Sequence, residues 1–97
     1  MDRKKALSAS VIIPAYNAEK TIGGCLDALL NQIRLPNEII VVDDGSTDQT
    51  KTIARSYSLV KIISQKNFGP AKARNEGARV AKSNIIVFMD SDCVPEK

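Results

Sequence analysis

The sequence has no histidine and no tryptophan, and its aromatic residues amount to two tyrosines and two phenylalanines among 97 residues. Without histidine, Ser-His-Asp and Cys-His catalysis and the usual zinc sites are excluded. A metal ion in this protein must therefore be hard and bound by oxygen, as Mg²⁺ and Mn²⁺ are. So few aromatic rings offer no platform on which bases could stack, and we expect no nucleic acid as a partner.

Long hydrophobic runs and secretory features are also missing. No apolar run approaches the length of a transmembrane helix, and no signal peptide is present. The two cysteines, Cys25 and Cys93, form no pairing motif, so we interpret both as reduced thiols. These absences predict a cytoplasmic protein, and they leave open an association with the cytoplasmic face of a membrane.

The composition bounds the size of the fold and the kind of partner. A hydrophobic fraction of 43% and a charged fraction of 26% fit one domain, or part of one, with a thin core. The net charge of +3 suits an anionic ligand or an anionic membrane surface, although a solvated surface with a few extra lysines is the better explanation of the charge alone.

Apolar runs alternate with helical periodicity along the chain. The apolar runs predict strands of a parallel sheet at residues 10–16, 38–43, 60–64 and 84–89. Helices are predicted at 18–33, from Ser46 to about Tyr57, and from Gly69-Pro70 onward. Asn17 is the expected N-cap of the first helix, and Ser46 to Gln49 has the form of a capping box for the second.

This β-α-β-α-β-α-β order predicts an α/β fold. Short connections and right-handed crossovers favour a doubly wound, Rossmann-like parallel sheet with strand order 3-2-1-4. Residues 1–9 are expected to form a polar N-terminal tail.

Acidic residues directly follow two of the predicted strands, as Asp43-Asp44 and as Asp90-Ser91-Asp92. The carboxyl ends of parallel strands meet at one edge of the sheet, where ligands bind in such folds. Asp90 and Asp92 can converge there on one divalent cation that bridges two phosphates. A solvated acidic turn is the alternative for each cluster, and the delivery of both to one edge favours a site.

Other residues at this edge have two interpretations each. One of Asp43 and Asp44 could brace the turn while the other accepts a hydrogen bond from a nucleobase imide, or both could be turn residues. Tyr16 could stack on a base or be a half-buried core residue. The helix that begins at Gly69-Pro70, with Lys72, suits an anion or the sugar end of a nucleoside. Glycine-rich NAD and P-loop motifs are absent, which disfavours both chemistries.

Taken in order, four segments resemble the family 2 glycosyltransferases of the GT-A fold. The segments are Ser10 to Asn17, Ile40 to Asp48, Asn67 to Asn75, and Phe88 to Asp92. The resemblance implies a nucleotide-diphospho-sugar, most often UDP-linked, and Mn²⁺ or Mg²⁺ as cofactor. It also implies inverting glycosyl transfer to a saccharide or lipid acceptor, as in cell-wall or polysaccharide biosynthesis.

The family pattern also implies roles for individual residues. The nucleoside pocket would be lined by Pro14, Ala15, Tyr16 and Glu19. Asp44 would accept from the uracil imide, with Asp43 bracing the loop. The base and ribose side would be closed by Asn67, Gly69 and Lys72. Asp90 and Ser91 would face the ribose and diphosphate, and Asp92, with Asp90, would bind the metal.

The end of the sequence departs from the family pattern. Only five residues follow Asp92, whereas family members continue into a second half that carries the acceptor site and the catalytic base. We therefore expect residues 10–97 to be the nucleotide-sugar-binding portion of a GT-A domain, truncated after the D-x-D motif and without a catalytic base. The alternative is a non-catalytic nucleotide-binding fragment, or one that self-associates through an exposed sheet edge.

Two other classes fit the segment after the first strand poorly. A phosphoacceptor receiver domain would need an acidic pair where Pro14 to Asn17 stands. A sugar nucleotidyltransferase would need a glycine-rich, arginine-bearing loop at the same place. Both are therefore disfavoured.

Overall fold

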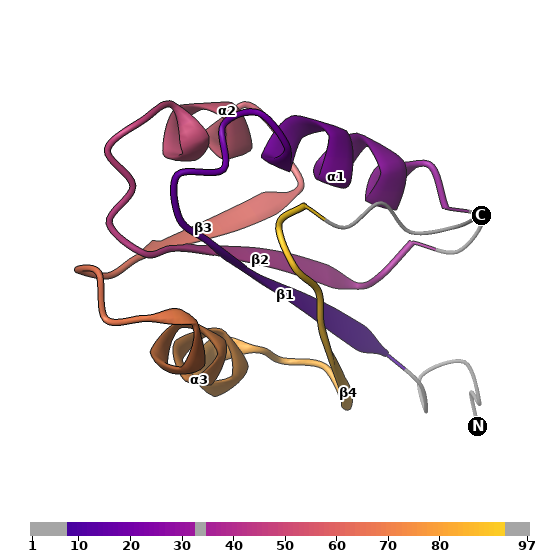
Figure 1. The fold of residues 1–97 in the computed structure, drawn as a ribbon. Coiled ribbons are helices and arrows are strands. Elements are labelled where there is room, and N and C mark those ends of the chain that lie inside the picture. The colour runs from indigo at the N-terminus through magenta and orange to yellow at the C-terminus, as the bar shows by residue number, and fades with distance from the viewer. Residues whose placement is uncertain (1–7, 33–34, 93–97) are drawn as a thin grey trace, which may run out of the picture.

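Four strands form one parallel sheet that lies between two layers of helices (Figure 1). The structure, a computed structural model, describes residues 8–32 and 35–92. Its elements in chain order are β1 (Ala9–Ala15), α1 (Ile22–Leu30), β2 (Glu38–Asp43), α2 (Thr50–Arg55), β3 (Val60–Ser64), α3 (Pro70–Val80) and β4 (Ile85–Phe88). The strand order β3-β2-β1-β4, with every neighbour parallel, confirms the predicted doubly wound α/β sheet.

The two faces of the sheet carry separate halves of the core. Helices α1 and α2 cover one face, and α3 covers the other (Figure 1). Side chains of β2 alternate between the halves, with Ile39 and Val41 on the α1 side and Ile40 and Val42 on the α3 side. All of β2 is buried, as expected for a central strand that is covered on both faces.

A tyrosine joins the two helices on the first face. The Tyr57 hydroxyl donates to Asp27 Oδ1 at 2.7 Å and also lies 3.1 Å from the carbonyl oxygen of Gly23. The hydrogen bond to Asp27, together with burial, raises the pKa of Tyr57 to about 12. The hydroxyl therefore stays protonated and links α1 to the end of α2.

The strand predictions are close to the structure, and the first helix is shorter than predicted. β2 and β3 have the predicted bounds, whereas β1 begins at Ala9, which pairs with Ile85 and so does not belong to a tail. The helix predicted over 18–33 extends from Ile22 to Leu30. Residues 1–7, most of the predicted tail, lie outside the described residues.

Both predicted helix caps are wrong. Asn17 lies well before α1 with φ of 47°, and its Oδ1 accepts from the N–H of Thr47 at 2.8 Å. Ser46 Oγ accepts from the N–H of Asn17 at 2.9 Å, and Gln49 makes no side-chain capping bond to α2. Short polar side chains can bond to any nearby backbone group. Here they bond across to the neighbouring loop instead of to their own helix.

Helix α3 approaches the sheet closely because Gly77 is on its inner face. A Cβ added at Gly77 would lie 2.3 Å from Ile12 Cγ2 and 3.3 Å from Val42 Cγ2. Ala73 is fully buried on the same face. These small residues let the helix lie close against the strands.

Replacing Gly77 with alanine is expected to destabilise the protein by about 1–3 kcal/mol, because the new methyl group must displace buried Ile12. Gly24→Ala is the matched control in α1, since nothing lies within 4 Å of its added Cβ. Helix propensity predicts that this control stabilises the protein by up to about 1 kcal/mol. Urea unfolding of both variants measures the difference, and equal stabilities would contradict the close packing of α3.

A buried carboxylate holds the amino ends of three strands together. Glu38 is only 8% exposed, and its Oε1 accepts from the Ser10 hydroxyl on β1 at 2.7 Å and from the N–H of Lys82 at 2.9 Å. Its Oε2 accepts from Lys61 Nζ on β3. The hydrogen bond from Lys61 dominates and lowers the pKa of Glu38 to about 2, against the opposing effect of burial.

This lowered pKa predicts an acid-dependent loss of stability. The stabilisation from ionised Glu38 is fully present above its ordinary pKa of 4.5 and is lost as the pH falls toward 2. In melting temperatures measured by circular dichroism from pH 7 to pH 2, Glu38→Gln should show a shallower fall than the wild type. The exposed Asp92→Asn should not. Parallel curves for the wild type and Glu38→Gln would show that this carboxylate is not linked to folding.

Candidate functional site

Polar residues gather where the strands end at their carboxyl edge. Ala15 and Asp43 are partners in the β1–β2 register, and the N–H of Asp44 donates to the carbonyl oxygen of Ala15 at 2.8 Å. On the other side of β1, Ile12 pairs with Phe88, and the chain then leads through Met89 to Asp90. The register therefore brings the ends of β1, β2 and β4 to one edge, as the sequence predicted.

Asp44 fixes the loop that precedes α3. The residue is 5% exposed, and its Oδ1 accepts from Gln65 Nε2 at 2.8 Å and from the N–H of Phe68 at 2.7 Å. Oδ2 accepts from the N–H of Gly69 at 3.0 Å. A carboxylate has about four acceptor sites, so the donors in the described part of the chain leave one site on Oδ2 for a further hydrogen-bond donor.

Asp43 is buried next to Asp44 but differs from it in hydrogen bonding. It is 4% exposed, and its Oδ1 has no hydrogen-bond partner among the described residues. The resemblance gave loop bracing to Asp43, but in the structure the bonds to the loop are made by Asp44. Buried polar atoms without partners are rare in folded proteins and are found at functional sites.

Gly45 lets the loop after β2 approach the loop between β3 and α3. Gly45 has φ of 77°, and a Cβ there would lie 2.9 Å from the backbone nitrogen of Asn67. Both the conformation and the space therefore require glycine at this position. The loop that follows Asp44 thus packs directly on the loop that Asp44 holds.

The end of β1 presents one exposed ring. Tyr16 is 49% exposed, which does not fit a core tyrosine and leaves its ring accessible at the edge. Pro14 is half-buried and Ala15 is buried, so Ala15 offers mainly its backbone. Glu19 is exposed, yet its Oε1 accepts from the N–H of Gln49 at 3.0 Å.

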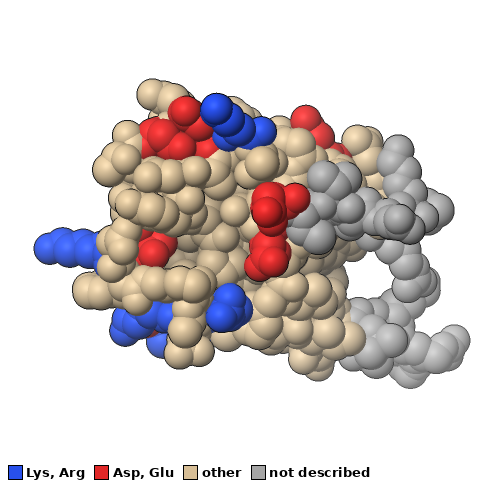
Figure 2. Space-filling model, viewed as in Figure 1, with Lys and Arg blue, Asp and Glu red and all other residues tan. Residues whose placement is uncertain are grey.

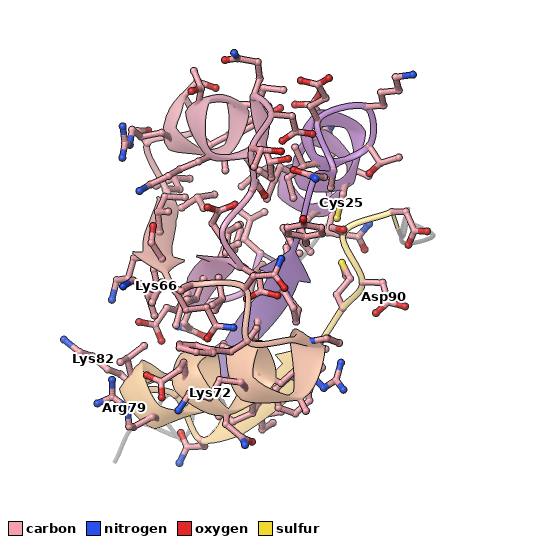
Figure 3. All side chains as sticks on the ribbon, turned by 60° about the vertical axis from the view of Figure 1, so that its left-hand side comes forward. Cys25, Lys66, Lys72, Arg79, Lys82 and Asp90 are labelled. Carbon is pink, nitrogen blue, oxygen red and sulfur yellow. The ribbon has the colours of Figure 1, made fainter. Side chains whose placement is uncertain are left out.

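The segment before α3 and the first turn of α3 supply the backbone of Gly69, the side-chain amide of Asn67 and the positive charge of Lys72. Gly69 has φ of 99°, Asn67 is exposed, and Lys72 Nζ lies 6.0 Å from the centre of the exposed Phe68 ring. Lys72 also lies 3.7 Å from Glu76 Oε2. Figure 3 shows Lys72 on α3, and Lys66 and Asp90 on opposite sides of the view, with Asp90 on the same side as Cys25.

The predicted metal ligands follow β4. Asp90 and Asp92 are exposed and Ser91 is half-buried. Acidic side chains are visible in the middle of the face shown in Figure 2. Two carboxylates are suitable oxygen ligands for Mg²⁺ or Mn²⁺. No group of three or more acidic or cysteine side chains that could hold a metal occurs in residues 8–32 and 35–92.

A thiol lies next to this segment. Cys25 Sγ is 3.8 Å from Met89 Sδ and 3.8 Å from the carbonyl oxygen of Asp90. The second cysteine, Cys93, lies outside the described residues.

Two residues of this edge were not found from the sequence. Gln65 binds Asp44 directly, and the exposed Phe68 donates its N–H to the same carboxylate. Gln65 comes immediately after β3. The rule that selected residues after the other strands could therefore have identified it.

A separate hollow lies at the opposite end of the sheet. It has a volume of about 230 Å³ and is lined by residues at the amino ends of β2, β3 and β4, namely Asn37, Glu38, Leu59, Lys61, Lys82 and Ser83. It contains no residue of the carboxyl edge, so it is not the predicted nucleotide pocket. Within residues 8–32 and 35–92, no helix is long and apolar enough to cross a membrane.

Comparison with known proteins gives a consistent family. The model of a family described as Glycosyl transferase family 2 matches residues 10–97. The chain is 40% identical over 87 residues to the uncharacterized glycosyltransferase YibD of Escherichia coli strain K12. That match covers 86% of this chain and 25% of the relative, so the chain spans about a quarter of its length.

Solved structures share the fold at similar identity. Staphylococcus aureus TarS 1-349 in complex with UDP-GlcNAc matches with a TM-score of 0.82 and 39% identity, over 89% of this chain and 27% of that one. The mannosyltransferase PcManGT from Pyrobaculum calidifontis, in complex with GDP-Man and Mn²⁺, matches with a TM-score of 0.82 and 31% identity, over 89% and 28%.

Proposed function

The chain belongs to glycosyl transferase family 2, and on that premise we propose that residues 10–97 bind the nucleotide-sugar of a glycosyltransferase reaction. The proposed ligand is a nucleotide-diphospho-sugar, with a uridine nucleotide as the first choice. TarS in complex with UDP-GlcNAc and PcManGT in complex with GDP-Man support this class of ligand. The position of the carboxylates at the sheet edge supports the location of the site.

The geometry of Asp44 carries this proposal. Three hydrogen-bond donors from residues 65–69 fix a buried carboxylate that keeps one acceptor site on Oδ2. A uracil, thymine or guanine ring presents an N–H group between or beside carbonyl groups, and that group would complete the shell of Asp44. Cytosine has an acceptor nitrogen at the corresponding position and would face the carboxylate without a hydrogen.

The remaining contacts follow from the places of the other predicted residues. We assign the nucleoside pocket to Pro14, Ala15 and the exposed ring of Tyr16. The base and ribose side is closed by Asn67, Gly69 and Lys72. Asp90 and Ser91 are proposed to face the ribose and diphosphate.

A divalent cation is the proposed cofactor. Asp92 and Asp90 would hold it, together with phosphate oxygens, because two exposed carboxylates alone leave its shell incomplete. When bound, Mn²⁺ or Mg²⁺ would neutralise negative charge on the departing diphosphate. The presence of Mn²⁺ in the PcManGT complex supports this choice.

The whole reaction requires groups that we place outside this chain. We propose inverting displacement at the anomeric carbon, with a saccharide or lipid-linked acceptor. The acceptor hydroxyl would lose its proton to a base that this chain does not supply. By itself, the chain is expected to bind the nucleotide without catalysing transfer.

Calorimetric titration of the chain with UDP and CDP tests the role of Asp44. The wild type should prefer UDP, by at least about tenfold for a hydrogen bond to a charged group. Asp44→Asn places an N–H₂ donor near the base, so the preference should disappear or turn toward CDP. Asp43→Asn changes a buried neighbour whose Oδ1 has no hydrogen-bond partner among the described residues, and it should keep the preference for UDP.

The same titration checks the cation. UDP affinity should rise with Mn²⁺ in the wild type and become independent of Mn²⁺ in Asp92→Ala. If the folded wild type binds neither UDP nor GDP with Mn²⁺, the proposed function of the isolated chain is wrong. A preference for UDP that Asp44→Asn keeps and Asp43→Asn loses would assign the base to Asp43 instead.

Self-association is the second candidate property, and the edge strand β4 favours it. Within the described part of the chain, β4 pairs only with β1 in the sheet, and its residues Ile85, Val87 and Phe88 are 43%, 40% and 50% exposed. An apolar, unpaired edge is a template for strand pairing. Such pairing would bury these three side chains.

Sedimentation velocity at increasing protein concentration should therefore show reversible oligomers. Val87→Lys should shift the chain to monomer, because a charge on an edge strand opposes pairing. The matched control is Leu59→Lys, which changes an equally apolar residue, 65% exposed, that precedes β3. Monomeric wild type at all concentrations would refute this property.

A further inference from the structure

Two loops at the carboxyl edge are joined by a reciprocal set of hydrogen bonds, which we call the clasp. It consists of residues 17–19, after β1, and residues 46–50, which extend from the loop after β2 to the first residue of α2. The loops belong to neighbouring strands, and the clasp residues follow directly after Tyr16 and Gly45. Among the clasp residues, the family resemblance placed only Glu19 in the nucleoside pocket.

Backbone groups of the first loop bond to side chains of the second. The N–H groups of Asn17, Ala18 and Glu19 donate to Ser46 Oγ at 2.9 Å, Thr50 Oγ1 at 2.7 Å and Asp48 Oδ2 at 3.2 Å. Three consecutive backbone N–H groups are thus satisfied by one partner loop. This arrangement fixes the path of the chain immediately after Tyr16.

Bonds in the reverse direction complete the clasp. Asn17 Oδ1 accepts from the N–H of Thr47 at 2.8 Å, and Glu19 Oε1 accepts from the N–H of Gln49 at 3.0 Å. Asn17 holds φ of 47°, a conformation that asparagine tolerates better than most residues. The carboxylate of Glu19 is therefore engaged by the second loop.

Thr50 is the centre of this arrangement. It is fully buried, and its Oγ1 both accepts from the N–H of Ala18 and donates to Asp48 Oδ1 at 2.5 Å. The N–H of Thr50 donates to the same Asp48 oxygen at 2.9 Å. Removing this single hydroxyl would take away the acceptor of the Ala18 N–H and one of the two bonds to Asp48 Oδ1.

We propose that the clasp sets the position of the Tyr16 ring relative to Asp44, and that Thr50, Asp48 and Glu19 are positioning residues for the nucleoside subsite. This inference rests on the proposed function for its effect on affinity. Tyr16 and Asp44 flank the β1–β2 pair, and the clasp is the polar link between the two loops that follow them. Glu19 thus acts through the loops and does not contact the nucleoside.

The test compares two substitutions at one buried atom. Thr50→Val keeps the shape but lacks the hydroxyl, whereas Thr50→Ser keeps the hydroxyl. UDP affinity with Mn²⁺ should fall by about tenfold or more in Thr50→Val and stay within about twofold of wild type in Thr50→Ser. Tyr57→Phe, which removes the Asp27 bond outside the clasp, controls for general destabilisation and should keep its affinity.

Amide spectra of the same variants give a readout that does not need a ligand. In ¹H–¹⁵N spectra, Thr50→Val should shift the amide signals of Tyr16, Asp44 and Gly45, and Tyr57→Phe should leave them in place. Unmoved signals in Thr50→Val would overturn the inference. If the wild type binds no UDP but Thr50→Val still shifts these amide signals, the proposed function is refuted and the positioning role of the clasp stands.

A second variant covers the case in which Thr50→Val does not fold. Asp48→Asn keeps one oxygen for Thr50 and replaces the other acceptor, which serves the N–H of Glu19, by a donor. It should move the Tyr16 and Asp44 signals and weaken UDP binding in the same direction. Normal affinity and unmoved signals in Asp48→Asn would equally overturn the inference.

Discussion

The parallel register between β1 and β2 determines where every polar group of the carboxyl edge lies. Ala15 stands opposite Asp43, and the bond from the Asp44 amide to Ala15 extends the pairing one step beyond the strands. The chain leaves both strands at the same height, so the two following loops meet and can exchange hydrogen bonds. A slip of one residue would move Asp43 and Asp44 each to the other face of the sheet and separate the loops.

Buried carboxylates at the two ends of β2 differ in how completely they are hydrogen-bonded. Glu38 at the amino end has partners on β1, β3 and the segment after α3, and its charge is fully compensated. At the carboxyl end Asp44 keeps a free acceptor site, and one Asp43 oxygen has no partner in the described part of the chain. At the amino end, the fully hydrogen-bonded carboxylate of Glu38 stabilises the sheet. At the carboxyl end, carboxylate oxygens that can still accept hydrogen bonds are what a ligand site requires.

The sequence predicted those features that depend on burial and missed those that depend on contacts between loops. The continuous apolar run of β2 fits a central parallel strand, and both its bounds and the strand order were predicted correctly. Asn17 and Ser46 are residue types that commonly cap helices, but the residue type does not specify which backbone group its side chain bonds to. The bracing role likewise fell on Asp44 and not Asp43, because neighbouring strand residues point to opposite faces and only the fold shows which face carries the loop.

The pairing of β4 with β1 has a consequence for the order in which the protein assembles. It joins Ala9 to Ile85, a separation of 76 residues, whereas β1–β2 contacts span 28 residues, as between Ser10 and Glu38. The extra closure entropy is small, under about 1 kcal/mol, but long-range pairing slows folding. The segment with Asp90 and Asp92 should then be the last part of the edge to dock and the first to detach. The carboxylates on β2 would be in place before the pair beyond β4 arrives, so the two halves of the edge would have different lifetimes in the native ensemble.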